Sequence, residues 1–202
     1  MPDPLLPGPD PTVQPVPSAV TAAVDAADST LQNPRTAVVA LGSNMGNRLE
    51  TLQGAVDALE DTPGVRVKAV SPVYETDPWG VAPGSQADYF NAVVVVRTTL
   101  PPESLLERGH AIEEAYLRVR TERWGPRTID VDIVAYEGTV RDDPRLTLPH
   151  PRAHERAFVL VPWYDVEPAA VLPGRGPVAE LVETVGRQGV RPRADVELRL
   201  PE

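Results

Sequence analysis

The chain contains the stretch Arg123-Trp-Gly-Pro-Arg127-Thr-Ile-Asp130-Val-Asp132-Ile-Val134, and the second half of this stretch predicts a β-strand. Ile129, Val131, Ile133 and Ala135 alternate there with a second, more polar set formed by Thr128, Asp130, Asp132 and Val134. This is the two-residue period of a strand with one face against a core. The same period places the two aspartates on one face, with their α-carbons roughly 6.5–7 Å apart.

Two carboxylates so placed repel each other unless a cation lies between them. Mg²⁺ prefers oxygen ligands and commonly binds through one or two carboxylates together with substrate phosphates. Four arginines stand just upstream, and guanidinium groups match phosphate oxygens in a bidentate way; they are Arg118, Arg120, Arg123 and Arg127. The combination indicates a nucleoside triphosphate site. The aspartates alone would also suit a solvated strand face, and arginines near a helix end often interact only with its dipole.

Length, composition and charge narrow the class of protein. The chain has 202 residues, of which 42% are hydrophobic and 24% charged, as in one ordinary globular domain. The net charge is −10, and without the four aspartates of residues 1–34 the remainder carries −6. So acidic a domain is a poor candidate for nucleic acid, which binds broad basic faces. The arginine cluster therefore indicates a small anionic ligand.

Residues 1–34 differ from the rest of the chain. They hold eight of the 24 prolines and no aromatic residue, so we expect a disordered extension before a domain spanning residues 35–202. No targeting signal and no membrane-length apolar run is found, and the chain has no cysteine. We expect a cytoplasmic protein without a membrane partner, and a monomer.

Hydrophobic patterns predict a further series of elements. We expect a buried strand over 36–41, a helix over 47–61 opened by Asn47 and Glu50 as a capping box, a half-exposed strand over 65–69 that continues at 72–76, and a central strand over 91–97. A helix opened by Pro101 and Pro102 follows, with Glu113 off its apolar stripe. Later elements are helices near 153–160 and 177–186 and an edge strand at 196–200.

The resulting order, β-α-β-β-α-β followed by helical additions, predicts the α+β class. It fits a ferredoxin-like split βαβ fold, in which a mainly antiparallel sheet carries its helices on one face, with extra helical elements at the C-terminal end.

Several side chains suit transfer of a phosphate-containing group, where catalysis is mainly positioning and electrostatic stabilisation. Asp130 and Asp132 could hold two metal ions, while Arg118 and Arg127 pair with phosphates. A second cationic group is formed by His150, Arg152 and Arg156. The aromatic residues Tyr89, Trp124 and Phe158 could stack on a flat acceptor, and Asn91 could hydrogen-bond an amide-like ring edge. Taken singly, Tyr89 and Phe158 are better explained as core residues, and His150 as part of a structural turn.

The aspartate-arginine stretch resembles the signature of 6-hydroxymethyl-7,8-dihydropterin pyrophosphokinase, a family of the folate pathway. Four further blocks in residues 36–172 are similar to that family in order and spacing: Ala40-Leu-Gly-Ser-Asn44, Tyr74-Glu-Thr76-x-Pro78-x-Gly80, Asp88-Tyr-Phe-Asn91-Ala and Leu146-Thr-Leu-Pro-His150-Pro. The resemblance implies Mg²⁺-dependent transfer of pyrophosphate from ATP to the pterin, with release of AMP. Residues 1–34 and 175–202 lie outside it.

The resemblance also implies roles for individual residues. Asp130 and Asp132 would bind two Mg²⁺ ions, and Arg118 and Arg127 would act with them in catalysis. The ATP side would be formed by Glu113, Arg118, Arg120, Arg123, Trp124, Arg127, Ile133, Arg145, Thr147, His150 and Arg156. The pterin side would be formed by Thr76, Pro78, Trp79, Tyr89, Asn91, Trp124, Asp130 and Phe158.

Three other functions compete with this hypothesis. A nucleotidyltransferase also combines Gly-Ser with Asp-x-Asp, but Gly42-Ser43 is separated from Asp130 by most of the domain. A catalytically silent nucleotide-binding module would be favoured by loss of the aspartates or of Arg118 and Arg127, which are all present. A metal-dependent hydrolase would leave Tyr89, Asn91 and Trp124 unexplained.

Overall fold

The computed structural model describes residues 33–78, 82, 84–116 and 128–201. Its centre is a six-stranded sheet built from β1 (Arg35–Ser43), β2 (Val65–Val70), β3 (Tyr74–Thr76), β4 (Tyr89–Thr98), β5 (Asp130–Tyr136) and β10 (Val190–Pro192). The strand order is β10-β3-β4-β1-β5, with β2 also paired to β4, and every pair is antiparallel. The predicted α+β class and antiparallel sheet are confirmed.

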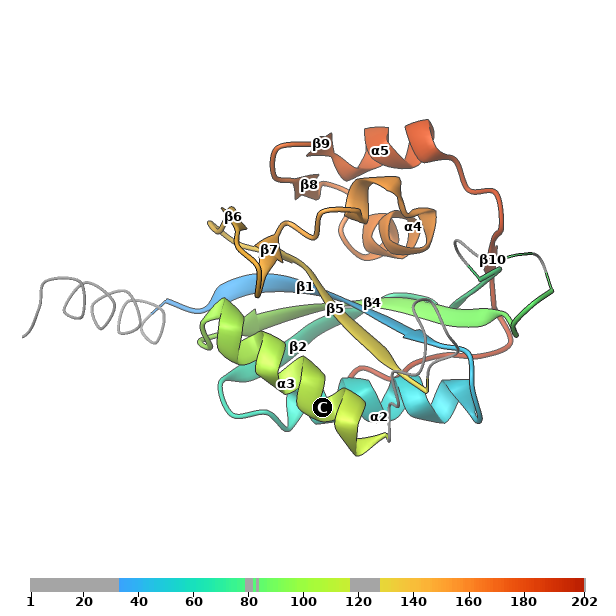
Figure 1. Ribbon diagram of the computed structural model, residues 1–202, viewed down its shortest axis with the longest axis horizontal. Coiled ribbons are helices and arrows are strands. Elements are labelled where there is room, and N and C mark those ends of the chain that lie inside the picture. The colour runs from blue at the N-terminus through green and yellow to red at the C-terminus, as the bar shows by residue number, and fades with distance from the viewer. Residues whose placement is uncertain (1–32, 79–81, 83, 117–127, 202) are drawn as a thin grey trace, which may run out of the picture.

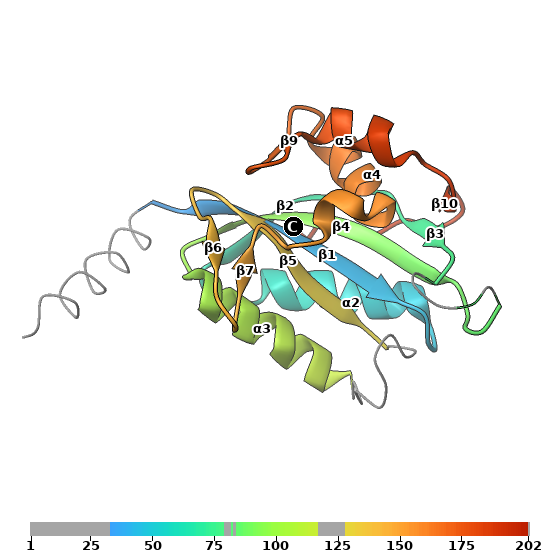
Figure 2. The same cartoon turned by 45° about the horizontal axis from the view of Figure 1, so that its top comes forward.

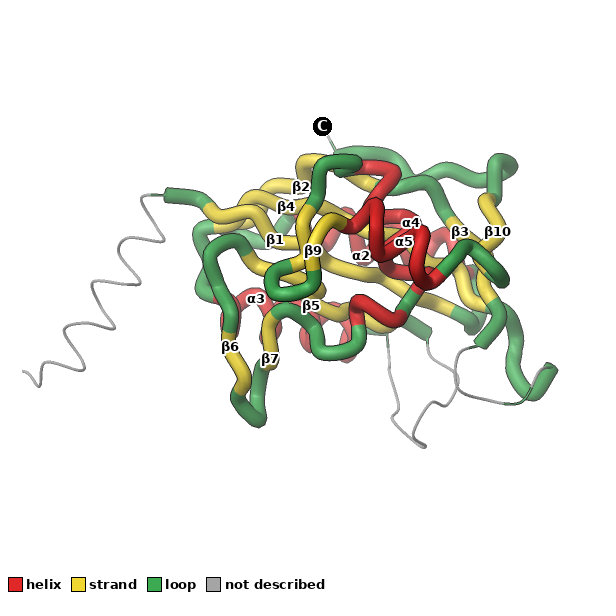
Figure 3. Tube along the Cα trace, turned by 90° about the horizontal axis from the view of Figure 1, so that it is seen from above, coloured by secondary structure: helices red, strands yellow, loops and turns green. Residues whose placement is uncertain are grey.

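Helices cover both faces of this sheet (Figures 1 and 2). One face carries α2 (Arg48–Glu60) and α3 (Pro102–Ala115). The other carries α4 (Ala157–Val166), and α5 (Val178–Val185) packs over α4. Viewed from above, α4 and α5 lie across the strands (Figure 3). The expectation of helices on one face thus holds for α2 and α3 only, because the C-terminal helices bury the second face.

The short elements connect these layers. They are the paired strands β6 (Arg141–Asp142) and β7 (Thr147–Leu148), a 3₁₀ turn at Ala153–Glu155, and the paired strands β8 (Val171–Leu172) and β9 (Gly176–Pro177). The helix expected near residues 153–160 is therefore a 3₁₀ turn followed by α4. In the part of the chain that the structure describes, no helix is long and apolar enough to cross a membrane.

The central strands are buried on both sides, as the continuous apolar run of β4 predicts. Val39 and Val94 belong to the core under α2 and α3, whereas Val38 and Val93 belong to the core under α4. Each fully buried valine of this kind contributes about 1.5–3 kcal/mol. The sheet is therefore fixed from two sides, and the ends of its strands form a rigid base for side chains.

Helix α2 begins as the sequence predicts. The Asn47 side-chain oxygen accepts a hydrogen bond from the Glu50 backbone N–H at 3.4 Å, which satisfies one of the unpaired donors of the first turn. Its apolar residues Leu52, Val56 and Leu59 are buried against the sheet.

Helix α3 packs closely against β5 at Gly109. A β-carbon on Gly109 would lie 3.2 Å from Cγ1 of Val131, so glycine allows this approach. The neighbouring Glu113 was expected off the apolar stripe, but it is 4% exposed. Its carboxylate accepts a hydrogen bond from the Val131 backbone N–H at 2.9 Å. Its position off the stripe did not predict this burial, which is possible because the backbone of β5 satisfies the carboxylate.

Two other expectations are corrected. Val134 was assigned to the polar face of its strand but is 1% exposed, because α4 covers that part of the sheet. The edge strand expected at residues 196–200 does not form; those residues are assigned to no strand. Leu198 is instead buried in the core beside α2, and the edge strand of the sheet is β10.

Candidate active site

The floor of the site is formed by β4, β1 and β5, and the register of these strands decides which residues lie side by side there. Gly42 of β1 is paired with Asn91 of β4 on one side and with Asp130 of β5 on the other. Paired residues of antiparallel strands point to the same face of the sheet. A β-carbon on Gly42 would lie 3.0 Å from Oδ1 of Asn91, so any side chain there would fill the space between the amide and the carboxylate. Glycine keeps this space open.

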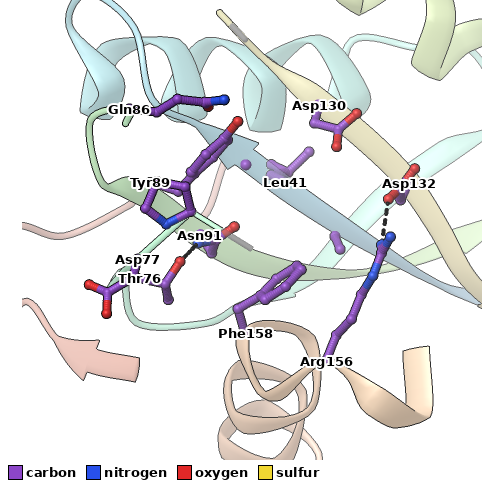
Figure 4. A pocket seen from close by; sticks show the side chains of 13 residues that line it. Leu41, Thr76, Asp77, Gln86, Tyr89, Asn91, Asp130, Asp132, Arg156 and Phe158 are labelled. Atoms are coloured by element: carbon purple, nitrogen blue, oxygen red, sulfur yellow. Dashed lines mark hydrogen bonds and ion pairs between the residues drawn. The ribbon is translucent and has the colours of Figure 1, made fainter. Parts of the chain in front are cut away.

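A first pocket opens above this floor (Figure 4). It is lined by Ala40, Leu41, Gly42, Thr76, Asp77, Pro78, Gln86, Tyr89, Asn91, Asp130, Asp132, Arg156 and Phe158. Asp130 and Asp132 border the same pocket, which agrees with the shared strand face that the alternation predicts. Two aromatic side chains, two amides and one guanidinium therefore line a pocket that also holds three carboxylates.

Asn91 is held in a fixed orientation. It is 6% exposed, and its amide nitrogen donates a hydrogen bond to Oγ1 of Thr76 at 2.7 Å. Thr76 is itself 4% exposed and lies on β3. Because one amide donor is committed to Thr76, the carboxamide can present its remaining groups to a polar ring edge without rotating.

Asp132 lies beside two basic side chains. Nη1 of Arg156 is 3.2 Å from Oδ2 of Asp132, and Nε2 of His150 is 3.9 Å from the same oxygen. Burial lowers the pKa of His150, and the charge on Arg156 lowers it further, against the opposing effects of Asp132 and Asp130. The ion pair with Arg156 connects the start of α4 to β5.

A second pocket lies on the other side of Asp132. It is lined by Leu106, His110, Glu113, Val131, Asp132, Ile133, Asp143, Pro144, Arg145, Leu146, Thr147, His150 and Pro151. Backbone N–H groups of Leu146 and Arg145 donate to Asp143 at 3.0 and 2.9 Å and lower the pKa of its carboxyl. The backbone N–H of His150 donates to the Val134 carbonyl at 2.8 Å, which ties this segment to β5.

The described candidate residues gather in these two pockets. The first contains the predicted residues Thr76, Pro78, Tyr89, Asn91, Asp130, Asp132, Arg156 and Phe158. The second contains Glu113, Ile133, Arg145, Thr147 and His150, and it shares Asp132 with the first. Six candidates lie outside the described residues: Trp79, Arg118, Arg120, Arg123, Trp124 and Arg127.

The structure places the two remaining basic candidates differently. Arg156 was placed with the nucleotide, but it lines the first pocket at its border with Asp132. Arg152 was grouped with His150 and Arg156; it lines neither pocket, and its Nε is 3.6 Å from Oε2 of Glu155. Arg156 can reach Asp132 because it precedes α4 directly, whereas Arg152 lies before the 3₁₀ turn.

The sequence interpretation missed several lining residues. Asp77 and Gln86 border the first pocket, and His110 and Asp143 border the second. The small residues Ala40 and Gly42 also line the first pocket. Their alternation in an otherwise bulky buried strand was a signal in the sequence for the pocket itself. Such a pattern is typical of a strand that leaves room for a ligand. His110 stands one helical turn before Glu113, and helical spacing relates those two residues.

Known proteins are similar to this chain in sequence and in fold. A family model, 7,8-dihydro-6-hydroxymethylpterin-pyrophosphokinase (HPPK), matches residues 38–168. The chain is 50% identical over 139 residues to the 2-amino-4-hydroxy-6-hydroxymethyldihydropteridine pyrophosphokinase of Methylorubrum extorquens, which covers 68% of this chain and 86% of the relative. It is 41% identical over 184 residues to the protein of the same name from Mycobacterium tuberculosis, covering 81% and 94%.

Solved structures share the fold. Plasmodium falciparum HPPK-DHPS with pteroate matches with a TM-score of 0.59 and 15% identity over 75% of this chain and 42% of that chain. An HPPK-DHPS in complex with substrates matches with a TM-score of 0.59 and 13% identity, over 75% and 43%. The chain thus spans less than half the length of these two proteins, and at such identity the likeness concerns the fold. The family match and the relatives of similar length together show that the chain belongs to the 7,8-dihydro-6-hydroxymethylpterin-pyrophosphokinase family of enzymes.

Proposed function

We propose that this pyrophosphokinase of folate biosynthesis transfers the β,γ-pyrophosphate of ATP to the hydroxymethyl group of 6-hydroxymethyl-7,8-dihydropterin. The hydroxymethyl oxygen attacks the β-phosphorus and loses its proton, the bond from that phosphorus to the α,β-bridging oxygen breaks, and AMP leaves. The observation that carries the proposal is that Asp132 borders both pockets, with Asp130 beside it. A donor and an acceptor in the two pockets would meet at these carboxylates.

The first pocket suits the pterin. Tyr89 and Phe158 offer aromatic faces to a planar heterocycle, and the fixed amide of Asn91 can pair with an amide-like ring edge. Pro78 adds a further apolar surface to the first pocket. Trp79 and Trp124, which lie outside the described residues, are assigned to the same substrate through the family signature.

The second pocket suits the triphosphate. Arg145 and His150 can donate hydrogen bonds to phosphate oxygens, and the Thr147 hydroxyl and the buried carboxylate of Glu113 provide further polar groups. Ile133 gives it an apolar wall. Arg118, Arg120, Arg123 and Arg127 are assigned to the ATP phosphates, with Arg118 and Arg127 acting in catalysis, on the signature alone.

Asp130 and Asp132 fit Mg²⁺. Carboxylate oxygens are the hard donors that this ion prefers, and it usually completes its coordination with substrate phosphates and water. Two bound ions would neutralise phosphate charge and polarise the acceptor hydroxyl. The protein itself orients the ligands: Arg156 holds Asp132 at 3.2 Å, and the Val131 N–H bonded to Glu113 fixes the strand between the two aspartates.

The expectations about the whole chain remain part of this proposal. We infer that the enzyme acts as a monomer in the cytoplasm on small-molecule substrates. The extension predicted at residues 1–34 lies outside the described residues except for 33 and 34, and we infer that the functional domain spans residues 35–202. The acidic charge of the domain supports small molecules over nucleic acid as its ligands.

The test is an assay with Mg-ATP and the pterin that follows AMP. AMP is expected only when both pterin and Mg²⁺ are present. Formation of ADP or inorganic phosphate instead would indicate a kinase or a hydrolase. ATP binding without any turnover would indicate a silent nucleotide-binding module.

Replacing Asn91 with alanine should act on one substrate. Loss of the amide removes a buried hydrogen-bonding group, which costs about 1–3 kcal/mol, so the KM for the pterin should rise roughly 5- to 150-fold. The KM for ATP should change little, because Asn91 lines only the first pocket. Steady-state kinetics with each substrate varied in turn checks this, and an equal rise in both KM values would contradict the assignment.

A further inference from the structure

The C-terminal segment that follows α5 lies beyond the residues matched by the family model, yet it reaches the pterin side of the site. Its strand β10 pairs with β3, with Val190 opposite Thr76 and Arg191 opposite Glu75. β3 is only three residues long, and it carries Thr76, the hydrogen-bond partner of Asn91. β10 thus makes β3 an inner strand of the sheet instead of an edge.

Arg191 makes a bridge between two acidic residues. Its Nη1 is 2.9 Å from Oδ1 of Asp77, and its Nη2 is 2.7 Å from Oδ2 of Asp88. Asp77 follows Thr76 and lines the first pocket, while Asp88 directly precedes Tyr89. One planar guanidinium therefore joins the ends of the two segments that supply Thr76 and Tyr89. Without it, the two carboxylates would lose their shared counter-ion.

The surrounding contacts make this bridge part of a larger network. Arg193 and Arg48 both reach Oε1 of Glu75, at 3.1 and 2.9 Å, and Arg48 also donates to the Asp88 carbonyl at 2.7 Å. The guanidinium carbons of Arg48 and Arg193 lie 3.7 and 4.9 Å from the centre of the Phe90 ring. Glu75 and Asp88 are thus each held by an arginine of the C-terminal segment and by Arg48.

The segment is also anchored beyond the bridge. Leu198 is buried against the core beside α2, and the Gln53 side chain pairs with both the N–H and the carbonyl of Arg199, at 2.7 and 3.1 Å. The C-terminal end accordingly runs from the edge of the sheet to α2 (Figure 1). Arg191 is fixed on its strand from both directions, so its guanidinium can position Asp77 and Asp88 rather than follow them.

We propose that Arg191 is a positioning residue for the pterin pocket, which it serves by bridging Asp77 and Asp88 and so holding Thr76 and Tyr89 in place. This inference rests on the proposed function, because it assigns the first pocket to the pterin. The bridge is partly exposed, with side-chain accessibilities of 45% for Arg191, 68% for Asp77 and 41% for Asp88. Its effect is therefore moderate and weakens with salt.

The test compares Arg191→Ala with Arg175→Ala in the full chain. Arg175 is exposed in the turn between β8 and β9 and lines neither pocket, so it is a matched control in the same C-terminal region. Pterin affinity is measured by titration with a non-hydrolysable ATP analogue and Mg²⁺ present, alongside both KM values and Tm. Arg191→Ala should weaken pterin binding about three- to tenfold, with ATP KM and Tm close to those of the control.

Two more variants test the bridge, and Arg191→Lys does so even where Arg191→Ala folds poorly. Arg191→Lys keeps the charge but loses the two-armed fork, and it should recover only part of the affinity. Asp88→Asn removes the carboxylate that pairs with Nη2 of Arg191. In combination with Arg191→Ala it should weaken binding by less than the product of the two single effects, because both changes break the same bridge. Independent, multiplicative effects would overturn the proposal.

The remaining outcomes separate this inference from the proposed function. If the wild type binds and converts the pterin while Arg191→Ala equals Arg175→Ala, only the role of Arg191 is overturned. The same holds if both KM values rise together with a fall in Tm, which indicates a general structural role. A wild type that neither binds nor converts the pterin overturns both.

Discussion

Asp132→Ala should reduce kcat by roughly a thousandfold or more, because the variant loses a proposed metal ligand and with it several kcal/mol of charge stabilisation. It also removes the only carboxylate that borders both described pockets, and it separates Arg156 from its partner at 3.2 Å. The fold should survive, since the Asp132 side chain is 36% exposed and belongs to neither core.

The measurement is kcat at saturating Mg-ATP and pterin, together with Tm. Asp61→Ala is a suitable control, because Asp61 is an exposed aspartate just after α2 and lines neither pocket. A variant of Asp132 that keeps a rate within a few-fold of the wild type would remove the metal assignment. A large loss of Tm would show that the residue has a structural role instead.

Glu113→Ala should lower both stability and turnover. It leaves the buried Val131 N–H without its acceptor at 2.9 Å, which costs about 1–3 kcal/mol of unfolding free energy. Val131 lies between the two aspartates, so movement of its backbone shifts both carboxylates. Denaturant unfolding and kcat measured on the same preparation check the two effects.

A conservative variant separates the hydrogen bond from other effects of the change. Glu113→Gln keeps a side-chain oxygen that can accept from Val131, and it should restore most of the lost stability. Glu114→Ala changes the exposed neighbour on the same helix and should leave both quantities near the wild-type values. If Glu113→Gln is as unstable as Glu113→Ala, the backbone hydrogen bond is not what the carboxylate contributes.

Local patterns predicted the central elements well. The continuous apolar run in β4 and the alternation in β5 depend on neighbouring residues only, and both strands form. The same alternation placed Asp130 and Asp132 together. The row of Asn91, Gly42 and Asp130 could not be predicted in this way, because it depends on the register of three strands that lie far apart in the sequence.

Residues whose surroundings come from distant segments were harder to predict. The burial of Glu113 was not predicted, because nothing near it in sequence reveals the Val131 N–H that it accepts from. The alternation of Val196, Leu198 and Leu200 suggested a strand. The segment instead buries Leu198 and leaves Leu200 exposed, and the pairing edge belongs to β10. Periodicity indicates which residues can be buried but not what they pack against.

The central claim is that pyrophosphate moves as one unit between ligands that meet at Asp132. Phosphorus NMR of a reaction containing the enzyme, Mg-ATP and 6-hydroxymethyl-7,8-dihydropterin tests this directly, because it identifies both products. We expect AMP and a pterin carrying two linked phosphates, formed in equal amounts. The appearance of ADP with a pterin monophosphate, or of AMP with free pyrophosphate and unchanged pterin, would contradict the claim.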